Sequence, residues 1–170
     1  MKTSQKVIKV ARVDDIPVLL AQMKKMGLAS LLDSHFPTHG NWQGLSLGEV
    51  GTVWLSHILS EGDHRLNSVQ DWATGRLGVL GSCLQTPDLR ELDFSDDRLG
   101  QVLDYLGADD AAWESYERDQ NATLLRVYDL KARRVRIDST TAKSYVAVTQ
   151  DGQFQLGHSK QHRPDLPQLK

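Results

Sequence analysis

The sequence has a single cysteine, Cys83, among its 170 residues. It cannot form a disulfide within the chain, and a metal cluster built on cysteine is excluded. A long apolar run is also missing, since no stretch could span a bilayer and residues 1–12 lack the apolar core of a secretory signal. We therefore expect a cytoplasmic protein without a membrane contact, in which Cys83 is a small buried residue.

The charge is small in sum but uneven along the chain. Residues 1–130 contain 12 Lys and Arg against 19 Asp and Glu, a balance of −7. Residues 131–170 contain 8 against 3, a balance of +5, so the net charge is −2. A basic end on an acidic body indicates either a local contact with a polyanion or a solvated basic surface.

The first 130 residues have the patterns of a helical bundle with about six helices. Gly27 separates two short helices, and Pro37 ends the second. The run S-L-G-E at 46–49 has the form of a capping box and opens a helix that stops near Gly62. Further helices are expected after Asn67 as a cap, from Ser95 to Gly107, and from 109 to about 127 with an inward face of Trp113, Tyr116, Leu124 and Val127. Residues 76–94 predict a loop.

From residue 131 the pattern changes to that of strands. R-R-V-R-I-D-S alternates charged and apolar residues, and the runs 145–150 and 153–157 flank Asp151-Gly152, a strong hairpin signal. A lone hairpin is marginal in water, so these residues predict the opening of a larger domain. The fold class expected is mainly α, with a helical domain over 1–130 and the first β-strands of an incomplete α/β domain over 131–170.

Three sets of residues are candidates for chemistry. Asp138 ends the run R-V-R-I, where a carboxylate could bind Mg²⁺ at a sheet rim or simply bond nearby hydroxyls. The helix face of His57, Glu61 and His64 has ligand-type spacing, but a structural histidine is the preferred interpretation because Gly62 should end the helix. The third set is a cluster of basic and N–H donor side chains: His158, Lys160, His162 and Arg163. It indicates either contacts with phosphates or a solvated loop.

Taken together, R-I-D-S-T-T-A-K and G-H-S-K-Q-H-R-P-D-L-P-Q resemble the start of the catalytic domain of bacterial insertion-sequence transposases of the DDE type. In that family an RNase H-like fold carries the first catalytic aspartate on its first strand, which corresponds here to Asp138. The segment from Gly157 to Gln168 is the most specific part of the resemblance. The helical part, including D-D-R-L-G-Q-V-L-D-Y-L, also resembles the N-terminal domain of unknown function that precedes it.

The resemblance implies DNA transposition, with Mg²⁺ held by two aspartates and a glutamate for attack on phosphodiesters. Asp138 would be the first ligand, and the other two would lie beyond Lys170, so we expect this chain alone to be inactive and to bind Mg²⁺ weakly. The implied partners are element-end DNA and either a second copy of this chain, forming a homo-oligomer, or a full-length transposase. Two alternatives stay open: a non-catalytic regulator that binds DNA ends or transposase, and a degraded gene product of poor solubility.

Overall fold

The computed structural model describes residues 10–131, 148, 154–156 and 167–169. The chain divides into two compact units, Met1–Lys131 and Ala132–Lys170. The first unit is helical, and the described part of the chain as a whole is mainly α. Its helices are α1 (Ile16–Lys25), α2 (Leu28–His35), α3 (Leu47–Glu61), η1 (Leu66–Ser68), α4 (Val69–Thr74), α5 (Leu77–Leu84), η2 (Glu91–Phe94), α6 (Asp96–Leu106) and α7 (Asp110–Val127).

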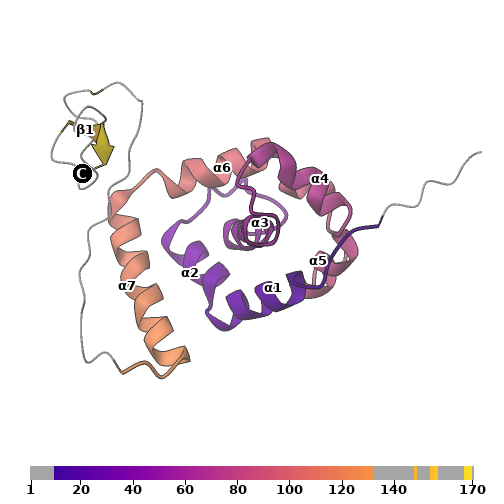
Figure 1. The fold of residues 1–170 in the computed structure, drawn as a ribbon, viewed down its shortest axis with the longest axis horizontal. Coiled ribbons are helices and arrows are strands. Elements are labelled where there is room, and N and C mark those ends of the chain that lie inside the picture. The colour runs from indigo at the N-terminus through magenta and orange to yellow at the C-terminus, as the bar shows by residue number, and fades with distance from the viewer. Residues whose placement is uncertain (1–9, 132–147, 149–153, 157–166, 170) are drawn as a thin grey trace, which may run out of the picture. The chain divides into compact units, whose positions relative to one another are not determined.

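Helix α3 is the centre of the helical unit, and Figure 1 shows it almost end-on with α1, α2, α4, α5 and α6 around it. Its buried side chains are Leu47, Val50, Thr52, Val53, Ser56 and His57. The apolar ones, Leu47, Val50 and Val53, join the inward faces of α1, α2, α4 and α6 in one core. Burial of that shared apolar surface is the main force holding short helices that would be marginal alone.

Several helix ends lie where the sequence predicts them. Ser46 accepts a hydrogen bond from the Glu49 N–H, the Glu49 side chain accepts one from the Ser46 N–H, and Gly62 follows the helix at φ 64°. The capping box and the end of α3 are therefore confirmed. The break at Gly27 (φ 67°) and the N-cap of α6 at Ser95 are confirmed as well.

The segment 76–94 corrects the sequence-based expectation of a loop, because it contains α5 and η2. Glycines in this run suggested irregular backbone, but Gly81 is buried in α5, where an added Cβ would lie 2.9 Å from the Thr86 carbonyl oxygen. Glycine is therefore used here for close packing and not to break a helix. Asn67 is not a cap either, since it lies inside η1, directly before α4.

The backbones of α2 and α3 approach each other closely at Gly48. A Cβ built on Gly48 would lie 2.1 Å from the Ala29 carbonyl oxygen, so the two backbones touch where only glycine fits. At the same point the Gly48 N–H donates to Oδ1 of Asp33 at 2.7 Å. A carboxylate on α2 thus supports the N-terminus of α3, where the helix dipole favours a negative charge.

Helix α7 packs on the outside of α2 (Figure 1). The side chains of Trp113 and Tyr116 pack against the core, as their spacing predicts, and the Phe36 ring lies 4.9 Å from that of Trp113. None of the residues of α7 is fully buried, and both amide atoms of Gln120 are enclosed without a hydrogen-bond partner. The predicted inward face is therefore confirmed for Trp113 and Tyr116, whereas Leu124 and Val127 are only partly buried and do not pack against the core.

Of the second unit the structure describes one small antiparallel pair, β1 (Phe154–Gln155) with β2 (Gln168–Leu169). The predicted hairpin about Asp151-Gly152 is not shown, because that turn lies outside the described residues. Val148, from its first predicted strand, belongs to no regular element.

We predict that Gly48→Ala lowers the free energy of unfolding by about 3 kcal/mol or more, because the new methyl group overlaps the Ala29 carbonyl. Gly100→Ala in α6 is the matched control: its Cβ meets no atom within 4 Å, so it should raise stability by about 0.5–1 kcal/mol. Urea unfolding followed by circular dichroism measures both. Equal effects of the two changes would show that the α2–α3 contact is not tight.

Candidate functional site

The residues that the sequence singles out for catalysis, metal binding and nucleic-acid binding lie outside the described residues. These are Asp138, His158, Lys160, His162 and Arg163. The structure therefore neither brings them together nor separates them. Among the residues that it does describe, no group of three or more His, Cys, Asp or Glu is placed to hold a metal ion.

His57 is 2% exposed, so it is a buried structural histidine, the interpretation that the sequence favours. Its ring meets that of Trp72 edge to face at 5.3 Å, and its Nδ1 atom has no hydrogen-bond partner. Glu61 accepts hydrogen bonds from Trp72 Nε1 at 2.9 Å and from Arg76 Nη2 at 3.1 Å. Because α3 ends at Glu61, His64 lies beyond the helix and does not share its face.

The environment of His57 favours its neutral form. Burial lowers the pKa of His57, because the charged imidazolium would lose its hydration. Asp63 and Glu61 oppose this shift, while Arg76 and Arg65 add to it. The arrangement suits packing at the end of α3 better than metal binding or proton transfer.

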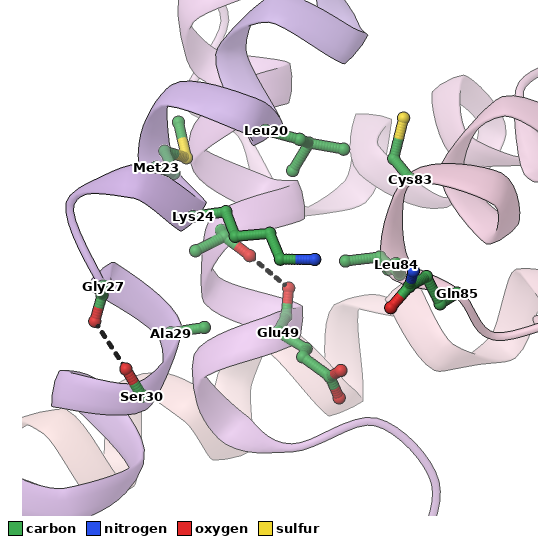
Figure 2. A pocket seen from close by; sticks show the side chains of 11 residues that line it. Leu20, Met23, Lys24, Gly27, Ala29, Ser30, Glu49, Cys83, Leu84 and Gln85 are labelled. Atoms are coloured by element: carbon green, nitrogen blue, oxygen red, sulfur yellow. Dashed lines mark hydrogen bonds between the residues drawn. The ribbon is translucent and has the colours of Figure 1, made fainter.

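A cavity of about 370 Å³ lies between α1, α2, α3 and α5, and it is one candidate site of the helical unit (Figure 2). Helix α1 contributes Leu20, Met23 and Lys24, and α5 contributes Cys83 and Leu84. The remaining lining residues come from the start of α2, from α3 and from the residue after α5: Gly27, Ala29, Ser30, Glu49, Thr52 and Gln85. Its volume falls within the range of small-molecule sites, about 300–1,000 Å³.

Most polar groups around the cavity already have partners. The Thr52 hydroxyl donates to the Glu49 carbonyl oxygen at 2.9 Å, and the Ser30 hydroxyl donates to the Gly27 carbonyl oxygen at 2.9 Å. Glu49 Oε2 accepts the Ser46 N–H at 2.8 Å in the capping box. Lys24 differs, because it forms no ion pair with any acid of the described part of the chain.

Sequence reasoning missed this cavity. Its walls come from four segments spread between residues 20 and 85, and each lining residue fits the ordinary pattern of its own helix. Helix α5 was itself expected to be a loop, so Cys83 and Leu84 could not be placed on a wall. No local signal in the sequence marks the site.

Comparison with known proteins gives no relative: no family model, curated protein or solved structure matches the chain. No helix in the described ranges combines the length and apolarity needed to cross a membrane.

We predict that His57 makes stability fall at mildly acid pH. The pKa of His57 is lower in the folded chain than in the unfolded chain. As the pH falls below about 6.5, the unfolded chain therefore binds a proton before the folded chain does. Above about pH 6.5 the protonation of His57 leaves the free energy of unfolding unchanged. Below that pH the free energy of unfolding decreases by up to ~1.4 kcal/mol per pH unit. His57→Phe, which keeps a ring against Trp72, should remove the slope, whereas His64→Gln at an exposed position should keep it. Unfolding in urea between pH 8 and 5 measures the effect, and an unchanged slope in His57→Phe would contradict it.

Proposed function

We propose that this chain is the N-terminal portion of an insertion-sequence transposase of the DDE type, acting in the cytoplasm on DNA. One observation carries the proposal: the order of features along the chain. A helical unit is followed by a basic strand-like run ending in Asp138, and then by the segment G-H-S-K-Q-H-R-P-D-L-P-Q. The single cysteine and the basic balance of residues 131–170 are consistent with it.

In this proposal residues 131–170 begin an RNase H-like domain, and each named residue has a separate task. Asp138 supplies one oxygen ligand for Mg²⁺, which in such enzymes activates water and then a 3′ hydroxyl for in-line attack. His158, Lys160, His162 and Arg163 contact phosphates, because cationic and N–H donors position a nucleic-acid backbone without reading its sequence. Of the three carboxylates that such a reaction requires, residues 1–170 supply one.

A second candidate function is protein association by the helical unit, with another transposase copy as the partner. The observation that favours it is the balance of −7 over residues 1–130, which disfavours extensive contact with the DNA backbone. Under this alternative the chain would regulate a complete transposase without any chemistry of its own.

We predict that the 170-residue chain does not nick supercoiled DNA in the presence of Mg²⁺, because one carboxylate does not hold a two-metal site. Agarose-gel conversion of supercoiled to open-circular plasmid measures the activity, and Asp138→Ala should leave the background unchanged. Metal-dependent nicking that Asp138→Ala abolishes would show instead that these residues contain a working site.

We predict salt-dependent DNA binding that depends on the basic segment. In fluorescence anisotropy with a labelled duplex, Lys160→Gln and Arg163→Gln should each weaken binding and reduce the slope of log K against log salt by about one. Lys25→Gln, on the acidic helical unit, is the matched control and should change neither quantity. Binding absent from every variant, the unaltered chain included, would favour the association-only function.

A further inference from the structure

The cavity between α1, α2, α3 and α5 combines an apolar wall with one unpaired cation, Lys24. The wall is formed by Leu20 and Met23 of α1, with Cys83 and Leu84 of α5 opposite (Figure 2). Figure 2 also shows the Lys24 side chain reaching toward α5. A site of this kind binds through apolar contact and uses few polar groups to orient its ligand.

We propose that this cavity binds a small amphipathic carboxylate, with its apolar body between α1 and α5 and its carboxylate on the Lys24 ammonium. The inference is independent of the transposase proposal, since it uses residues of the helical unit alone.

The charge at Lys24 selects the sign of the ligand. No acid of the described residues pairs with this ammonium, although residues 1–130 have a balance of −7. A carboxylate would give the cation the partner that the protein does not supply, and would keep the charged end of the ligand toward water. A neutral apolar molecule would gain only the burial of its surface.

Glu49 is the acid that lines the cavity, and its position does not exclude an anion. Its Oε2 atom is bound to the Ser46 N–H at 2.8 Å, which holds the carboxylate at the start of α3. Figure 2 shows it pointing away from Lys24. The negative charge is thus used by the capping box, where the dipole of α3 favours it.

Cys83 provides a built-in reporter, because it lines the cavity, is half-buried and is the only cysteine of the sequence. The test follows alkylation of the full 170-residue chain by N-ethylmaleimide with mass spectrometry. Octanoate and 1-octanol are each titrated over the same concentration range, below the concentration at which octanoate forms micelles. Octanoate should half-protect Cys83 at a concentration about fivefold lower than octanol, the size expected for one solvent-exposed charge pair.

Two variants separate the charge effect from general apolar uptake. Lys24→Gln should make octanoate no better than octanol, and Lys25→Gln, the adjacent lysine outside the lining, should leave the fivefold preference intact. Both positions are exposed, so both variants should keep the fold. Calorimetric titration with octanoate gives the same comparison without relying on the thiol.

Three results would overturn the proposal. The first is equal affinity for octanoate and octanol in the unaltered chain. The second is a preference that survives Lys24→Gln. The third is protection of Cys83 that rises with protein concentration alone, which would mean that a second copy of the chain covers the cavity.

Discussion

The contact between the backbones of α2 and α3 at Gly48 is the constraint on which the helical unit depends. It fixes how closely α2 can approach the central helix, and the Asp33 carboxylate bonded to the Gly48 N–H fixes the position along the helix axis. With α2 so placed, Phe36 meets the aromatic residues of α7. The start of α2 then forms one wall of the cavity, so the contact with α7 and this wall both depend on the approach at Gly48.

Helix α3 buries three polar side chains, those of Thr52, Ser56 and His57. The Thr52 and Ser56 hydroxyls donate to carbonyl oxygens three and four residues earlier, so their burial requires no partner from another helix. His57 has no such local acceptor, and it is tolerated because it stays neutral and packs on Trp72. Next to this core, a cation–π contact joins α6 to the segment before α3. The guanidinium carbon of Arg98 lies 3.5 Å from the centroid of the Trp42 ring.

Helix ends in the first unit could be predicted from the sequence because capping depends on residues three or four positions apart. Ser46 with Glu49, Gly62 and Ser95 all act locally. Helix α5 could not be predicted, because the close packing of Gly81 against Thr86 overrides the low helix propensity of glycine. The cavity could not be predicted either, because it depends on how four helices pack against one another. The candidate residues from Asp138 to Arg163 rest on the sequence pattern and on the resemblance, because they lie outside the described residues.

The position of α7 has a mechanical consequence. This helix is the last element of its unit, none of its residues is fully buried, and α2 is its main neighbour. Tension applied to the chain after Lys131 would reach the contact of Tyr128 with Gln22 first, then the His35–Asp119 pair, and then Trp113. These contacts would break one after another at low force. Tension would reach helix α3 only after α7 had detached from α2, so α7 would separate from the unit before the central core is disturbed.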